Sequence, residues 1–138
     1  MCLVAMTVGF IGPCGMNTPH THPRATEFNY VVSGKFMTGM LQENGVRPIM
    51  GTVHEGQASL FPRGSIHFEV NLGCEPAVFV AAFSNPDPGV LQVAQGLFGL
   101  PSYIVGPVLG NALNPMQIAA LDAVIPANKR NWLDMGIV

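Results

Sequence analysis

Glycine and proline interrupt this chain so often that they leave room mainly for short regular elements. The 138 residues include 16 Gly and 12 Pro, spread along the whole length. Both residue types destabilise helix interiors and favour turns. The runs between them are short and rich in valine, phenylalanine and other residues that favour strands. The sequence therefore predicts many short strands joined by turns, around one hydrophobic core.

Up to residue 89, the apolar runs predict seven or eight strands at regular spacing, which favours an all-β sandwich or barrel. Residues 3–11 are apolar at nearly every position, so we expect that strand to be buried on both faces or nearly so. Asn44 and Gly45 suit a tight hairpin turn of the primed type. A short turn at 54–56 is expected to join two further strands as a pair. The expected strands cover residues 3–11, 27–32, 35–42, 47–53, 57–61, 66–70 and 76–83.

The pattern changes after the Asn-Pro-Asp-Pro-Gly segment at 85–89. From Val90 onward the apolar residues recur at helical spacing, which predicts a set of short helices. Asn114 and Pro115 suit the cap and the first residue of the last helix. We therefore assign residues 1–89 to a β-barrel. Residues 90–138 form a helical extension of the same structural domain, packed on the barrel or on a partner subunit.

The composition narrows the range of partners. Hydrophobic residues make up 49% of the chain and charged residues only 10%, which indicates that part of the apolar excess lies at a subunit interface. We expect a homodimer or a higher homo-oligomer. The net charge of −2, without any basic run, argues against a nucleic-acid partner. No apolar run is long enough to cross a membrane, and the first residues lack the basic segment of a signal peptide.

The cysteines indicate no disulfide framework. Cys2, Cys14 and Cys74 are odd in number and form no C-x-x-C pair. We expect them to behave as small buried hydrophobic residues in a reducing compartment. Together with the absent signal peptide, this favours a cytoplasmic location.

Three of the four histidines and one carboxylate gather in two short stretches of the chain. His20 and His22 project from the same face of an extended segment, because strand side chains repeat every two residues. In a small barrel, Glu27 from the next strand and His67 from a distant one can converge with them. A lone H-x-H motif is weak evidence, but three imidazoles with a carboxylate suit a divalent transition metal. Manganese, iron, cobalt, nickel and zinc all fit this ligand chemistry.

Two more polar side chains share the inward face of these strands. Glu69 should point the same way as His67, and Asn29 the same way as Glu27. A partly buried carboxylate beside a divalent cation is a candidate general base, and its plainer alternative is a solvated or supporting residue. His54 lies outside both stretches at an expected turn, and we expect it to be solvated. Apolar side chains on the expected strands can shape the substrate space, among them Met37, Met40 and Phe79.

The spacing of the two stretches resembles the two motifs of the cupin superfamily in their germin form. The matching positions are His20, His22, Glu27 and Gly34 in the first motif, and Gly56, Pro62, Gly64, His67 and Asn71 in the second. With residues 83–90 and the helical tail, the resemblance extends over nearly the whole chain. It is greatest for spherulin-like germins of the fungal or slime-mould type.

This resemblance implies a double-stranded β-helix, or jelly-roll barrel, with His20, His22, Glu27 and His67 as ligands of one ion, manganese as the first choice. It also implies subunits that associate through the C-terminal helices. Asn17 matches an asparagine that lies near the metal in germins with oxalate oxidase activity. Together with Glu69 and Asn29 it is a candidate catalytic residue. A second asparagine of those germins falls on Thr7 here, which disfavours oxalate as the substrate.

Three functions follow as expectations. The first is a metal-dependent germin-like oxidoreductase acting on a small organic molecule. The second is a lyase, isomerase or cyclase that uses the ion as a Lewis acid and a residue such as Glu69 as a base. The third is a non-enzymatic metal-binding or ligand-binding protein of storage or stress. Many germins are secreted, whereas the start of this sequence favours the cytoplasm.

Overall fold

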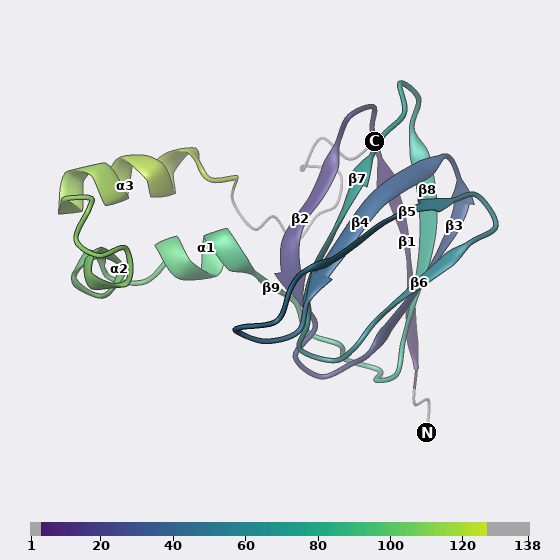
Figure 1. The fold of residues 1–138 in the computed structure, drawn as a ribbon, viewed down its shortest axis with the longest axis horizontal. Helices are drawn as coiled ribbons and strands as arrows, with labels where there is room; N and C mark the ends of the chain where they lie inside the picture. Colours follow the sequence, from purple (N-terminus) through teal and green to yellow (C-terminus); the bar gives the residue numbers. More distant parts are fainter. Residues whose placement is uncertain (1–3, 127–138) are drawn as a thin grey trace.

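The computed structural model describes residues 4–126, which form two antiparallel sheets followed by three short helices (Figure 1). The first sheet has the strand order β1-β8-β3-β6 and the second the order β5-β4-β7-β2-β9. This is the expected jelly roll, in which consecutive strands often lie in different sheets. The strands are β1 (Ala5–Ile11), β2 (Met16–Thr21), β3 (Glu27–Ser33), β4 (Lys35–Leu41), β5 (Ile49–His54), β6 (Ala58–Phe61), β7 (Ile66–Asn71), β8 (Ala77–Phe83) and β9 (Leu91–Gln92).

The hydrophobic core fills the space between the two sheets. Alternate residues of β8 are buried, because strand side chains point in turn to opposite faces. Phe79 of β8 meets Phe36 of β4 edge to face, with ring centroids 5.7 Å apart. A Cβ atom at Gly9 would lie 2.2 Å from the Phe79 ring, so the core requires glycine at that point of β1. Ile11 and Val31 complete the centre of this packing.

The expected pairing of residues 47–53 with 57–61 is wrong. Strand β5 pairs with β4, whereas β6 pairs with β3 in the other sheet. The connecting turn carries the chain from one sheet to the other, and its Gly56 has a positive φ of 79°. Backbone hydrogen bonds from Glu55 to Gly34 and from Gly56 to Val31 tie this turn to the β3–β4 connection and to β3 itself. Contacts between distant segments, not the short turn, therefore select the partners of both strands.

The connection between β4 and β5 also differs from the predicted tight turn. Residues 42–48 separate the two strands, and of Asn44 and Gly45 only Gly45 has a positive φ. A primed two-residue turn needs a positive φ at both central positions. The segment is therefore a longer exposed loop.

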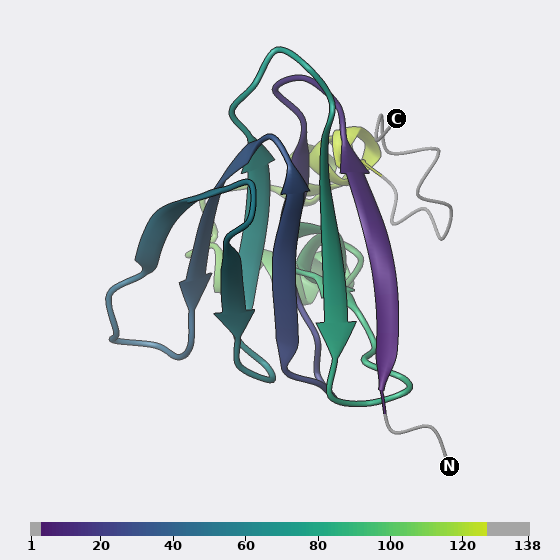
Figure 2. The same cartoon turned by 90° about the vertical axis from the view of Figure 1, so that its right-hand side faces the viewer.

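Strand β1 is buried on one face only, in contrast to the expectation from its apolar sequence. It is an edge strand of the first sheet, which Figure 2 shows face on with β1 in purple. The exposed side chains of this sheet continue across β3 and β6, since Phe28 lies opposite Leu60 in the pairing. We call this region the outer sheet face. It comprises Val4, Met6, Val8, Phe10, Phe28, Tyr30, Val32 and Leu60, all exposed.

The C-terminal extension begins with strand β9, which pairs with β2, where helical spacing had been expected. The helices are α1 (Val93–Phe98), α2 (Ser102–Val108) and α3 (Pro115–Val124). Asn114 caps α3 in a capping box with Gln117, and Pro115 takes the first position, as predicted. The three helices extend to one side of the barrel (Figure 1). In the described part of the chain, none of them is long and apolar enough to span a membrane.

The expectation of buried cysteines is wrong for the two that the structure describes. Cys14 and Cys74 are both exposed and carry free thiols. They lie in turns that connect strands, where side chains reach solvent, and not inside strands. Cys2 lies outside the described residues.

Candidate metal centre

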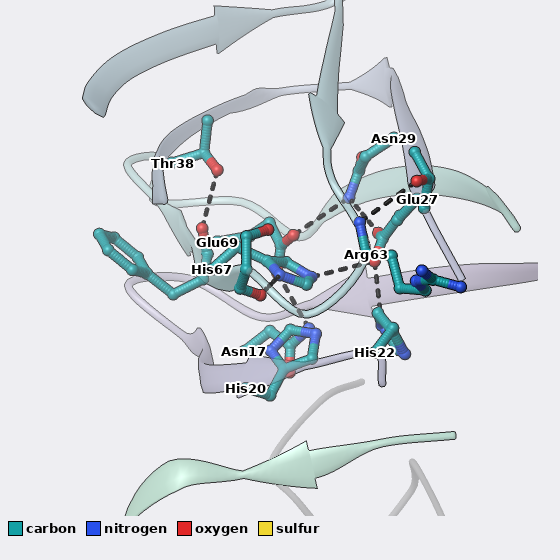
Figure 3. A network of polar contacts seen from close by, with 12 residues as sticks. Asn17, His20, His22, Glu27, Asn29, Thr38, Arg63, His67 and Glu69 are labelled. Carbon is teal, nitrogen blue, oxygen red and sulfur yellow. Dashed lines mark hydrogen bonds and ion pairs between the residues drawn. The ribbon is translucent and has the colours of Figure 1, made fainter. Parts of the chain in front are cut away.

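The four predicted ligand residues come together between the two sheets (Figure 3). His20 lies in β2 and pairs directly with His67 of β7. His22 follows the end of β2, and Glu27 is the first residue of β3 in the opposite sheet. All four side chains are buried, with exposed fractions between 1% and 8%. The jelly-roll topology thus gathers residues that are up to 47 positions apart (67 − 20).

The donor atoms of these side chains converge on one small volume. One ligand atom from each of the four residues lies within 4.8 Å of all the others. The Oε2 atom of Glu27 lies 3.0 Å from Nε2 of His22 and 3.1 Å from Nε2 of His67. Within residues 4–126, this is the one group of three or more His, Cys, Asp or Glu side chains that is arranged in this way.

Backbone carbonyls engage the other nitrogen of each imidazole. Nδ1 of His20 lies 2.8 Å from the Thr18 oxygen, and Nδ1 of His67 lies 3.0 Å from the Ser65 oxygen. Nδ1 of His22 meets the oxygen of Gly89. A carbonyl oxygen can only accept, so these contacts place a proton on Nδ1. In a neutral imidazole, the lone pair of Nε2 is then free to bind a metal.

This arrangement provides a test of whether a cation fits the site. With Nδ1 protonated, the Nε2 lone pairs of His22 and His67 face the lone pairs of Glu27 at about hydrogen-bond distance. Two lone pairs repel each other unless a proton or a cation lies between them. The donor set, three imidazoles and one carboxylate, is one that divalent transition metals bind. The residues therefore fit a metal ion.

The pKa shifts support this ligand chemistry. Burial, followed by electrostatic repulsion from His67, lowers the pKa of His20 from 6.5 to about 4. Burial alone would raise the pKa of Glu27, but with a proton between its carboxylate and Nε2 of His22 or His67, the resulting hydrogen bonds outweigh burial and lower this pKa to about 2. At neutral pH, His20 is therefore a neutral ligand and Glu27 an anionic one.

A second buried carboxyl group lies beside the cluster. Asn17 donates to Oε2 of Glu69 at 2.9 Å, and the amide of Asn29 lies 3.2 Å from both Glu69 Oε1 and Glu27 Oε1. Burial and then the charge of Glu27 raise the pKa of Glu69 well above its ordinary value of 4.5. The predicted inward orientation of Asn29 and Glu69 is confirmed. Their catalytic roles, and that of Asn17, stay predictions.

The remaining residues singled out in the sequence lie farther from the cluster. Thr7 shares a cross-strand row with Asn29, but Ala81 of β8 lies between them. His54 is exposed at the end of β5, as expected. Phe79 belongs to the core between the sheets. Met37 and Met40 are half-buried on β4.

A separate cavity of about 460 Å³ shares no residue with the cluster. It is an open depression among strand connections, and its walls include Lys35, His54, Glu55 and Cys74. None of the four candidate ligand residues lines it. The candidate metal site is therefore the buried cluster and not this cavity.

Sequence reasoning missed the contact between His22 and Gly89. The acceptor is a backbone oxygen 67 positions along the chain, in a segment that the sequence marks only as a turn. A pattern of side chains contains no signal for such a contact. The structure alone reveals it.

Comparisons with known proteins agree with this fold and site. The sequence profile of the cupin family matches residues 1–116. Spherulin-1A of Physarum polycephalum is 53% identical over 125 residues, which cover 91% of this chain and 50% of that protein. A putative germin-like protein of Arabidopsis thaliana, subfamily 1 member 9, is 44% identical over 89 residues, covering 64% of this chain and 40% of that protein.

A solved structure shows the same architecture at lower sequence identity. Oxalate oxidase in complex with the substrate analogue glycolate superposes with a TM-score of 0.84 at 29% identity. The match covers 92% of this chain and 65% of that chain. This chain spans half the length of the spherulins that it matches. From the profile match, the motifs and the jelly-roll architecture together, we conclude that the chain belongs to the cupin family, in its germin-like and spherulin-like branch.

Proposed function

We propose that this chain is a manganese-dependent germin-like enzyme that acts on a small organic molecule, with oxidation as its first reaction class. The observation that carries the proposal is the convergence of three imidazole nitrogens and one ionised carboxylate oxygen at a buried point. Four protein ligands leave two positions of an octahedral ion for water or substrate. Similarity to oxalate oxidase supports an oxidative reaction, and the resemblance to germins implies manganese.

Each part of the site has a distinct task in this proposal. His20, His22, Glu27 and His67 hold the ion, which when bound polarises substrate oxygens and exchanges electrons in an oxidative reaction. The carbonyl contacts at Nδ1 orient the rings before any ligand arrives. The aromatic rings of Phe61 and Phe83 pack against His67 and His22 and limit access of water to the ligands.

The buried Glu69 favours a second candidate function, a lyase, isomerase or cyclase reaction without net oxidation. A carboxyl group whose pKa is raised by burial is a stronger base than an ordinary carboxylate, and it can accept and return a proton. Its two amide partners, Asn17 and Asn29, hold it in place beside the ligands. In this case the ion stabilises negative charge on the substrate while Glu69 moves the proton.

Metal analysis tests the centre itself. Purified protein is expected to contain about one manganese ion per chain. The double variant His20→Ala with His67→Ala should lose the ion, because half of its ligands are removed. His54→Ala is the matched control, since this histidine is exposed and outside the cluster. Unchanged metal content in the double variant would contradict the proposal.

Activity measurements separate the reaction classes. Oxygen uptake or peroxide release with oxalate, glycolate or superoxide would support the oxidoreductase. Product formation under anaerobic conditions would support the proton-transfer enzyme. Stoichiometric binding of a small molecule without turnover by the metal-loaded protein would instead support a binding or storage role.

The outer sheet face supports a homo-oligomer as the working form. Seven of its eight exposed side chains lie on three strands of one sheet and Val4 directly precedes one of them, and a monomer in water would hydrate all eight. A second copy of the chain, which carries the same charge-poor face, is a suitable partner for a two-fold interface.

A further inference from the structure

We propose that Arg24 and Asp87 form a latch that positions the ligand His22 through the backbone carbonyl of Gly89. The inference rests on the proposed metal function, and it adds residues outside the cluster that determine how tightly the ion is held. We call Arg24, Asp87 and Gly89 the Arg24–Asp87 latch.

The three ligand imidazoles differ in where their carbonyl partners come from. His20 and His67 contact the oxygens of residues two positions earlier in the chain, Thr18 and Ser65. Their orientation therefore depends on local strand geometry. His22 contacts the oxygen of a residue 67 positions away. Its orientation thus depends on whatever holds that remote segment against the barrel.

Arg24 holds the remote segment by both its side chain and its backbone. Its Nη2 donates to Oδ1 of Asp87 at 2.6 Å, and its Nε donates to the Asp87 carbonyl at 2.9 Å. The backbone N–H of Arg24 donates to the oxygen of Pro88 at 3.1 Å. Arg24 is only two residues beyond His22, so these contacts anchor the segment close to the imidazole.

Asp87 then orients Gly89. The same Oδ1 atom that accepts from Arg24 also accepts from the backbone N–H of Gly89 at 3.2 Å. Gly89 has a positive φ of 64°, and a Cβ atom there would lie 2.7 Å from Nη2 of Arg24. Glycine is therefore required both by the backbone conformation and by the guanidinium packed against it.

These contacts form a continuous path from an exposed ion pair to a buried metal ligand. Arg24 fixes Asp87, Asp87 fixes the Gly89 peptide, and the Gly89 oxygen accepts from Nδ1 of His22. The side chains of Arg24 and Asp87 are 50% and 75% exposed, so their pairing contributes little to overall stability. Their effect should appear at the metal centre instead, because loss of the carbonyl partner lets the imidazole rotate.

The test compares manganese affinity in two variants of Asp87. Asp87→Ala removes both acceptor contacts of the carboxylate and should weaken manganese binding about tenfold, the low end for partners of metal ligands. Asp87→Asn keeps an oxygen that can accept from Gly89 N–H, so this variant should lose less manganese affinity than Asp87→Ala. Glu43→Ala, an exposed carboxylate in the loop between β4 and β5, is the control and should bind like the wild type.

A measurement on metal-free protein separates the latch from the proposed metal function. In the wild type, the Nδ1 proton of His22 should give a resonance protected from exchange by the Gly89 oxygen, and Asp87→Ala should lose that protection. Equal manganese affinity and an equally protected proton in Asp87→Ala would overturn the latch. A wild type that binds no manganese would overturn the proposed function, while the proton measurement would still decide on the latch.

Arg24→Lys provides a second variant if Asp87→Ala does not fold. It keeps the positive charge but removes the Nε donor and the planar geometry that meets two oxygens at once. It should also weaken manganese binding, and circular dichroism should show an unchanged fold. Affinity equal to that of the wild type in this variant would count against the latch.

Discussion

At the scale of single residues, two buried carboxyl groups in one site have pKa values shifted in opposite directions. When a proton lies on Nε2, the imidazoles of His22 and His67 hydrogen-bond Glu27 and stabilise its anion, whereas Glu69 has only neutral amides and a negative neighbour. Burial penalises both anions, but only Glu27 has partners that outweigh this penalty. A cation in the cluster would lower the pKa of Glu69 as well. This makes Glu69, and not Glu27, the group whose proton can move.

The shift at His20 predicts a pH dependence for the metal-free protein. The folded pKa of about 4 lies below the ordinary 6.5, so the unfolded chain binds a proton at a higher pH than the folded chain does. Stability should fall as pH drops from about 6.5 to about 4, by roughly 3 kcal/mol. Urea unfolding measures the free energy of unfolding of the wild type and of His20→Asn. The difference between the two free energies should shrink by that amount as the pH falls over this range. If the difference in the free energy of unfolding did not depend on pH, the lowered pKa of His20 would be contradicted.

Glu69→Gln tests the proton-transfer role. The amide keeps the size of the side chain but cannot exchange a proton, so turnover should fall by about 10²- to 10⁴-fold in a reaction that uses Glu69 as base. Manganese content should stay the same, because Glu69 is not one of the four ligands. Glu75→Gln, an exposed carboxylate, is the control. Full turnover with an unchanged pH profile would remove Glu69 from the mechanism.

At the scale of elements, a side chain at a strand end links connections that are far apart in the sequence. Asn71, at the end of β7, donates its amide to the oxygens of Ile11, Gly12 and Glu75 at 3.0, 2.9 and 2.7 Å. Its own oxygen accepts from Gly73 N–H at 2.8 Å. These bonds join the β1–β2 connection to the β7–β8 connection at one end of the barrel, where the two loops lie side by side (Figure 2).

Asn71→Ala should therefore destabilise the barrel without changing the metal ligands. Asn71 is buried, and truncation would leave several carbonyl oxygens without a donor. At about 1 kcal/mol for each lost bond, the free energy of unfolding should fall by about 2–4 kcal/mol. Urea unfolding measures this loss. Gln42→Ala, in the exposed loop between β4 and β5, should change stability by less than about 0.5 kcal/mol.

At the scale of the whole molecule, the barrel exposes one apolar face to water. The outer sheet face is apolar because the outward-facing residues of β1 and β3 are hydrophobic, namely Met6, Val8, Phe10, Phe28, Tyr30 and Val32. In a sheet with one solvated face, polar residues would alternate with apolar ones. The same feature made residues 3–11 look like a strand buried on both faces.

A pair of matched substitutions tests whether this face is a dimer interface. Val8 lies on the outer sheet face and is 45% exposed, and Val46 lies in the β4–β5 loop and is 41% exposed. Val8→Lys should shift the protein toward the monomer, because it places a charge in an apolar contact. Val46→Lys should leave the oligomeric state unchanged, because Val46 lies outside the outer sheet face. Light scattering after gel filtration measures the mass, and a monomeric wild type would refute the interface.

Much of the centre was predictable because it depends on short-range regularities. The two-residue period of strands placed Asn29 with Glu27 and Glu69 with His67. The motif spacing identified the four residues that the structure brings together. Asn114 was recognisable as a helix cap because capping depends on residues within one turn.

The sequence by itself thus determined the β class, the inward-facing side chains and the His/Glu cluster, since all three are encoded in local pattern and motif spacing. Only the tertiary structure decided that β5 pairs with β4, that one face of β1 is exposed, and that Gly89 orients His22. Each of these depends on contacts between segments far apart in the chain. Such contacts arise from packing of the whole barrel, and no local pattern specifies them.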